Sequence, residues 1–92
     1  MSMEPHFEIL YHPDVPQKDI PRITAADQRR IRRAIEQKLA LFPQEFGAPL
    51  RHTLKGYWKL GVGDWRVIYK VHTTTITILR IGHRREIYGK SA

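Results

Sequence analysis

The chain has 92 residues and an apolar fraction of 41%, which suffices for one small core, so we expect a single domain over residues 1–92. It has no cysteine, which excludes a disulfide framework or a cysteine zinc site and suits the cytoplasm. No apolar run approaches the roughly 20 residues that a membrane-spanning helix needs. The first residues also lack the basic and apolar regions of a secretory signal, so no membrane association is expected.

The net charge of +7 is concentrated in the C-terminal half. Residues 1–50 carry seven Lys or Arg and seven Asp or Glu, whereas residues 51–92 carry nine Lys or Arg and only Asp64 and Glu86. This asymmetry favours a polyanionic partner, either a nucleic acid or a strongly acidic protein. A basic surface that serves only solubility stays open as an alternative.

The first predicted elements are a strand and a short helix. Residues 7–11 place apolar side chains at every second position, as in a half-buried strand, and Pro13 ends the run. Asp14 can cap a following helix that tolerates Pro16 in its first turn. Pro21 then stops that helix or forces a corner.

The clearest helix is predicted from Thr24 to Phe42. Thr24 is a good N-cap residue, and Asp27 is well placed for a near capping box and for the helix dipole. Pro43 ends the helix. Four arginines on the outer faces are solvated or contact a partner: Arg29, Arg30, Arg32 and Arg33. One apolar stripe faces the core, with the stem of Lys38 beside it: Ile31, Ala34, Ile35, Leu39 and Phe42.

Three strand-like runs follow a loop over residues 44–49. They extend from Tyr57 to Val62, from Trp65 to Val71 and from Thr75 to Ile81, and short turns separate them, which is typical of an antiparallel meander. The whole order predicts an α+β fold, a small antiparallel β-sheet with two N-terminal helices packed on one face.

Alternation along these strands orients their side chains. Lys59 and Arg66 fall on the face away from the helices, and Arg80 and Arg84 join them from the last strand and its end. We therefore expect a basic cleft on this open face. The helix-facing set is apolar: Trp58, Leu60, Val62, Val67, Tyr69 and Val71.

The sequence lacks the motifs of most other catalytic sites. Its five histidines are scattered without helical i, i+4 spacing, and no HExxH, P-loop, GxSxG or GxGxxG occurs, so we expect neither a metal nor a cofactor. The remaining Lys, Arg, His and Tyr side chains suit metal-independent RNA cleavage, in which the substrate's own 2′-hydroxyl is the nucleophile. Arginines hold the phosphate and neutralise its charge, a Lys, His or Tyr moves protons, and a Tyr ring can stack on a base. A lysine base needs neighbouring positive charge to lower its pKa, which the arginines supply.

Two segments resemble the RelE/ParE superfamily of bacterial and archaeal toxins, namely WKLGVGDWRVIY at residues 58–69 and IGHRREIY at residues 81–88. FEILYHPDV near the start and the pattern Pro43…Gly47…Leu50…Leu54-Lys55-Gly56 also fit, so the resemblance covers nearly the whole chain. It implies the α+β fold described above. It also implies an mRNA endonuclease that works in the ribosomal A site, because RelE-like members cleave mRNA there.

The resemblance implies a role for each matching residue. Lys59 matches a strand lysine of the catalytic cleft, Arg66 the arginine that holds the scissile phosphate, and Arg84 the arginine that stabilises the transition state. Tyr88 matches a C-terminal tyrosine that stacks on or orients the substrate, and His83 stands where an acid, a base or a phosphate ligand is expected. Further candidates for substrate binding are Lys55, Lys70, Arg80 and Arg85, although Arg85 on a continuing strand would point away from Arg84 and favour a structural role.

One departure from the family pattern concerns the general base. RelE has a second strand lysine two residues after the first, and Gly61 occupies that position here, so the base would be Lys59 or His83. Two other functions stay open: a ParE-like inhibitor of DNA gyrase without nuclease activity, and a non-toxic basic binding module. Either toxin class implies a cognate antitoxin protein whose toxin-binding segment is partly disordered on its own.

Overall fold

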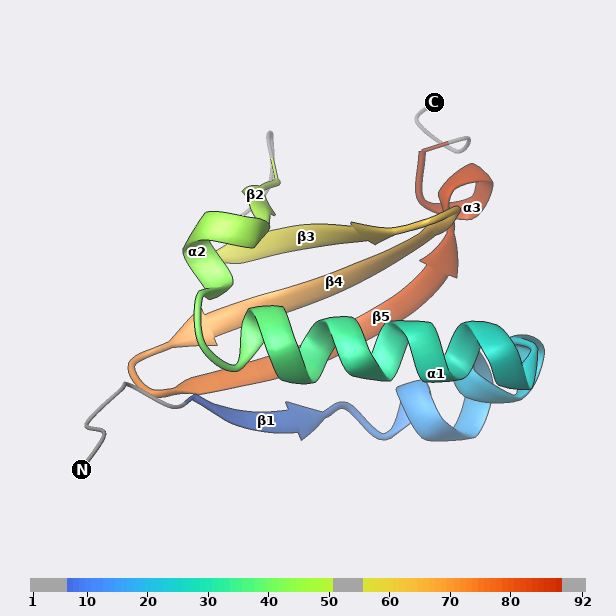
Figure 1. The fold of residues 1–92 in the computed structure, drawn as a ribbon, viewed down its shortest axis with the longest axis horizontal. Coiled ribbons are helices and arrows are strands. Elements are labelled where there is room, and N and C mark those ends of the chain that lie inside the picture. The colour runs from blue at the N-terminus through green and yellow to red at the C-terminus, as the bar shows by residue number, and fades with distance from the viewer. Residues whose placement is uncertain (1–6, 51–55, 89–92) are drawn as a thin grey trace.

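The computed structural model describes residues 7–50 and 56–88, and for Tyr88 the backbone alone. A five-stranded sheet has the strand order β1-β5-β4-β3-β2. The strands are β1 (Glu8–Tyr11), β2 (Ala48–Pro49), β3 (Tyr57–Val62), β4 (Trp65–His72) and β5 (Thr75–His83). The helices are η1 (Val15–Asp19), η2 (Ile20–Arg22), α1 (Ala25–Ala34), η3 (Ile35–Leu39), α2 (Pro43–Phe46) and α3 (Arg84–Tyr88). The predicted α+β fold, with helices on one face of a sheet, is confirmed (Figure 1).

The sheet is mixed, whereas we expected an antiparallel one. β3, β4 and β5 form the predicted antiparallel meander, but β1 pairs with β5 in parallel. The helices between β1 and β2 carry the chain back along the sheet to its opposite edge (Figure 1). Two reversals in the meander then leave β5 running in the direction of β1, so the two edge partners are parallel.

The long helix begins as predicted and ends earlier. The backbone N–H of Asp27 donates to the side chain of Thr24 at 3.2 Å, which is the expected N-cap. α1 continues into η3, which ends at Leu39, and Phe42 is non-helical and 45% exposed. Phe42 therefore does not belong to the apolar stripe, because Pro43 starts a separate short helix. Asp14 precedes η1 without a capping bond from its side chain, so that predicted cap is wrong.

The core lies between α1–η3 and the sheet. Tyr69 is fully buried, and its hydroxyl donates to the carbonyl oxygen of Pro43 at 2.6 Å. Burial raises the pKa of the Tyr69 phenol. A Cβ atom on Gly47 would lie 1.7 Å from that hydroxyl oxygen, so the loop can pass Tyr69 only as glycine. The other buried apolar residues are Val15, Ile23, Ile31, Ile35, Leu39, Ala40, Leu60, Val67, Ile76, Ile78 and Ile81.

A β-bulge in β5 decides the direction of Arg80. Ile78 pairs with Tyr69 and Arg80 pairs with Ile68, so Leu79 is an extra residue between them. Strict alternation from Ile76 and Ile78 would have turned residue 80 toward the core. The bulge instead places Ile81 in the core, where it is 2% exposed, and Arg80 on the opposite face.

Candidate functional site

The open face is the face of the sheet that is turned away from α1, and three neighbouring strands bring basic residues to it. The register places Lys59, Ile68 and Arg80 side by side on β3, β4 and β5. Adjacent strands lie about 4.8 Å apart, so the backbones of Lys59 and Arg80 are separated by roughly 10 Å. Arg66 lies one pleat further along β4, between Gly61 and Gly82. The sequence-based expectation that these three cations share one face agrees with this register.

The side chain of Arg66 is held by the turn between β3 and β4. Its Nη1 donates to the carbonyl oxygens of Gly63 and Trp65, both at 2.9 Å. A Cβ atom on Gly61 would lie 3.2 Å from Nη1 and 3.4 Å from Cζ, so the guanidinium group lies against the backbone of β3. A planar group fixed in this way is suited to bind a phosphate through two hydrogen bonds.

The same turn also fixes the start of α3. The carbonyl oxygen of Asp64 accepts the backbone N–H of Arg84 at 2.8 Å. Three successive carbonyls therefore hold two candidate phosphate ligands, Arg66 by its side chain and Arg84 by its backbone. Gly63 has a φ of +60°, a conformation that favours glycine and lets the turn present these carbonyls.

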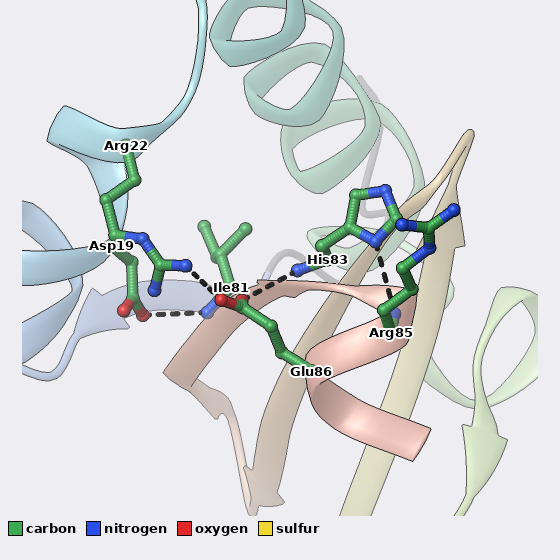
Figure 2. Close-up of polar contacts among 6 residues, drawn as sticks. All are labelled: Asp19, Arg22, Ile81, His83, Arg85 and Glu86. Atoms are coloured by element: carbon green, nitrogen blue, oxygen red, sulfur yellow. Dashed lines mark hydrogen bonds and ion pairs between the residues drawn. The ribbon is translucent and has the colours of Figure 1, made fainter. Parts of the chain in front are cut away.

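The segment IGHRREIY ends in a helix rather than in a strand. The backbone N–H of Arg85 donates to Nδ1 of His83 at 3.1 Å, and the backbone N–H of His83 donates to Oε1 of Glu86 at 3.2 Å (Figure 2). This is the reciprocal pattern of a capping box, with histidine as the N-cap and glutamate three residues later. Arg84 and Arg85 are thus successive exposed residues of α3, and the expected opposite orientation along a strand is wrong.

His83 lies on the helix-covered side of the sheet, away from Lys59 and Arg66. It pairs with Trp65 in the β4–β5 register, and the two rings make an edge-to-face contact with centroids 5.6 Å apart. Trp65 in turn donates its indole N–H to Asp27 of α1 at 3.0 Å, and this bond is the main cause of the lowered pKa of Asp27. Because Nδ1 of His83 accepts the bond that caps α3, the geometry gives His83 a structural task.

Lys70 lies at the other end of the open face. Its Nζ is 5.5 Å from the centre of the Tyr57 ring, its partner on β3. Lys70 lies four positions beyond Arg66 on β4, about 13 Å along the strand. Lys55 lies outside the described residues, and the side chain of Tyr88 is not described.

Two residues that the sequence reasoning missed tie the C-terminal segment to the N-terminal helices. Arg22 of η2 forms an ion pair with Glu86 of α3, and Asp19 of η1 accepts the backbone N–H of Ile81 at 2.9 Å (Figure 2). The hydrogen bond from Arg22 is the main cause of the lowered pKa of Glu86, and the charge of Arg80 adds to it. The His-x-x-Glu spacing could have revealed that Glu86 caps α3. No signal in the nearby sequence predicts the ion pair between Arg22 and Glu86.

Residues 7–50 and 56–88 contain neither a cluster of metal-ligating side chains nor a membrane-spanning helix. No group of three or more His, Asp or Glu side chains there could hold a metal ion. No helix within these ranges is long and apolar enough to cross a membrane.

Comparison with known proteins identifies the family. Residues 9–88 match the family model described as the ParE toxin of the type II toxin–antitoxin system parDE. The chain belongs to this toxin family. A 50-residue stretch is 40% identical to Toxin RelG of Mycobacterium tuberculosis and spans 52% of the present chain and 58% of RelG. The match therefore extends over little more than half the length of that relative.

The solved structures most similar in fold include toxin–antitoxin complexes. The RelBE2 complex of Mycobacterium tuberculosis gives a TM-score of 0.78 at 25% identity and covers 90% of this toxin and 95% of the matched chain. The RelB–RelE complex of Methanococcus jannaschii gives a TM-score of 0.70 at 22% identity and covers 87% and 95%, respectively. Together they support membership of the RelE/ParE superfamily and the RelE-like fold that the sequence resemblance implied.

Proposed function

We propose that this toxin is a ribosome-dependent mRNA endonuclease that cuts in the A site and so inhibits translation in the cytoplasm. One observation carries the proposal. The β3–β4 turn holds Arg66 by its side chain and Arg84 by its backbone, beside the row that contains Lys59 and Arg80. Such a cluster of cations on a sheet face suits a phosphodiester whose charge increases during reaction.

The proposed reaction uses the RNA's own 2′-hydroxyl as the nucleophile. This oxygen attacks the adjacent phosphorus, the bond to the 5′-oxygen of the next nucleotide breaks, and a 2′,3′-cyclic phosphate and a 5′-hydroxyl result. Lys59 accepts the proton of the 2′-hydroxyl, and solvent water returns one to the leaving oxygen. Arg66 and Arg84 neutralise the phosphate oxygens, Tyr88 stacks on or orients the substrate, and the surrounding cations bind the RNA backbone: Lys55, Lys70, Arg80 and Arg85.

A cognate antitoxin is part of the proposal. Two solved relatives were crystallised as toxin–antitoxin complexes. On the helix-covered side of this toxin, an apolar hollow of about 510 Å³ is lined by residues of β1, η2 and α1 that include Tyr11, Ile20 and Ile31. An amphipathic antitoxin segment would bury its apolar face there.

The test is cleavage of mRNA on programmed ribosomes, mapped at single-nucleotide resolution. Wild type should cut at A-site codons, and Arg84→Ala should lower the rate by at least about 100-fold, because a charge that stabilises the transition state is lost. Arg29→Ala removes an exposed arginine on α1 and is the matched control, expected to cut normally. Absence of cuts with a folded wild-type protein would contradict the proposal.

Inhibition of DNA gyrase is the second candidate, because the matching family model is that of ParE. It predicts that wild type and Arg84→Ala both block gyrase supercoiling while neither cuts mRNA. A non-toxic basic module predicts that expression of the chain does not arrest growth. The three functions therefore give three different outcomes.

A further inference from the structure

Gly61 lies on the open face at the point where the family pattern has a second lysine, and the guanidinium group of Arg66 lies against it. The two residues are direct partners in the β3–β4 register. A Cβ atom on Gly61 would lie 3.2 Å from Nη1, 3.4 Å from Cζ and 3.7 Å from Nε of Arg66. The first distance is shorter than about nine in ten real Cβ contacts, so a side chain at position 61 requires the guanidinium group to move by a few tenths of an ångström.

The backbone gives no other reason for a glycine at this position. Among the described glycines only Gly56 and Gly63 have positive φ, and Gly61 lies inside the regular β3–β4 ladder. Any residue can adopt this extended conformation, and a glycine inside a strand weakens it. The space for the guanidinium group of Arg66 is therefore the structural feature that a glycine provides here.

The guanidinium group of Arg66 lies toward β3, beside Gly61, rather than toward β5. On its other side, a Cβ atom on Gly82 would meet Ile87 at 3.2 Å, Glu86 at 3.3 Å and Arg80 at 3.5 Å, so that side is occupied. Over Gly61 the guanidinium group also reaches the carbonyls of Gly63 and Trp65. These two hydrogen bonds hold the guanidinium group of Arg66 beside β3, one pleat from Lys59.

We propose that Gly61 is a positioning residue: its missing side chain leaves the space in which the guanidinium group of Arg66, the proposed phosphate ligand, lies against β3. This rests on the proposed endonuclease function and deepens it, because it explains how the phosphate ligand of the site is held one pleat from Lys59. A lysine restored at position 61 would then compete with Arg66 for the same place instead of adding to it.

A double-mutant cycle tests the inference. Gly61→Ala should lower the single-turnover cleavage rate on programmed ribosomes by roughly 10- to 100-fold, as expected for a displaced catalytic group, without changing the toxin concentration at half-maximal rate. In an Arg66→Ala background, Gly61→Ala should change the cleavage rate less than twofold, because the substitution acts by displacing the Arg66 side chain, which is then absent. Multiplicative effects, or a rate in Gly61→Lys equal to or above wild type, would overturn the proposal.

The melting temperature of each variant is the control for folding. Gly61→Ala removes a strand glycine, so its melting temperature should equal or exceed that of wild type, and a purely structural defect would lower it. Thr77→Ala, on the same face beside Lys70, is the matched control and should leave the cleavage rate unchanged.

If the proposed endonuclease function is wrong, the wild-type protein will not cut mRNA on programmed ribosomes. The positioning role is then read by NMR from the Nε–H resonance of Arg66 in the free protein. Gly61→Ala should shift this resonance and speed its exchange with solvent, whereas Thr77→Ala should not. An unchanged Arg66 resonance in Gly61→Ala would overturn the inference in either case.

Discussion

Arg22 and Glu86 stand 64 residues apart in the sequence and form an ion pair that joins η2 to α3. Glu86 also accepts the backbone N–H of His83, so one carboxylate both caps α3 and anchors it to the N-terminal half. Since α3 begins with Arg84, this anchor determines where a candidate phosphate ligand lies relative to Arg66. Glu86, one of the two acidic residues in the basic C-terminal half, thus fixes the start of the helix that carries Arg84 and Arg85.

The first prediction concerns the pH dependence of this anchor. The folded protein lowers the pKa of Glu86, so the anchor stabilises the fold above the unfolded-state value of about 4.3 and is lost as the pH falls through the folded-state pKa. Glu86→Gln should therefore lower the melting temperature at pH 7 and converge with wild type toward pH 3. The measurement is a series of thermal melts between these values.

The control for this series is Glu45→Gln, which neutralises an exposed carboxylate on α2. It should track wild type at every pH. If Glu86→Gln also tracks wild type at pH 7, the ion pair contributes nothing to stability. The charge-reversed pair Arg22→Glu with Glu86→Arg should recover part of the loss if the pairing itself is responsible.

The strands, the long helix and the shared face of Lys59 and Arg66 followed from local signals, namely alternation, capping residues and glycine turns. The direction of Arg80 depends on the β-bulge at Leu79, which alternation does not predict. The parallel pairing of β1 with β5 did not follow from local signals either, because it depends on the path of the whole chain between them. The contact between Arg22 and Glu86 is equally non-local. The helix after His83 was missed for another reason: an apolar, β-prone run continues into it, and a histidine in the capping position is less telling than serine or threonine.

The second prediction concerns the buried hydroxyl of Tyr69. Tyr69→Phe removes the bond to the carbonyl oxygen of Pro43 and leaves that acceptor without this donor, which should cost about 1–2 kcal/mol of unfolding free energy. Gly47→Ala should cost more, because its methyl group would overlap the same hydroxyl. In a Tyr69→Phe background the added cost of Gly47→Ala should shrink, and urea unfolding of the four proteins measures this. Strictly additive costs would show that the overlap is not the cause.

The third prediction separates the two lysines of the open face. Lys59 lies on the strand next to Arg66, one pleat along, and is proposed as the base, so Lys59→Met should lower the cleavage rate by roughly 100-fold or more. Lys70 lies about 13 Å from Arg66 along β4, so Lys70→Met should mainly weaken binding, by less than about tenfold. Rates measured at saturating and at limiting toxin separate the two effects. Equal losses of rate at saturation would assign both lysines to the same role.

The last prediction concerns His83, for which sequence and structure point to different tasks. A proton-transferring histidine cannot be replaced by asparagine, whereas a helix N-cap can, because asparagine is among the best capping residues. Since Nδ1 of His83 accepts the backbone N–H of Arg85, His83→Asn should retain cleavage within about threefold, whereas His83→Leu should destabilise the fold by about 1 kcal/mol through loss of the cap. Ribosomal cleavage and urea unfolding of both variants provide the comparison. A cleavage rate in His83→Asn that falls 100-fold while stability is kept would return the acid–base role to His83, and the helix cap would then be secondary.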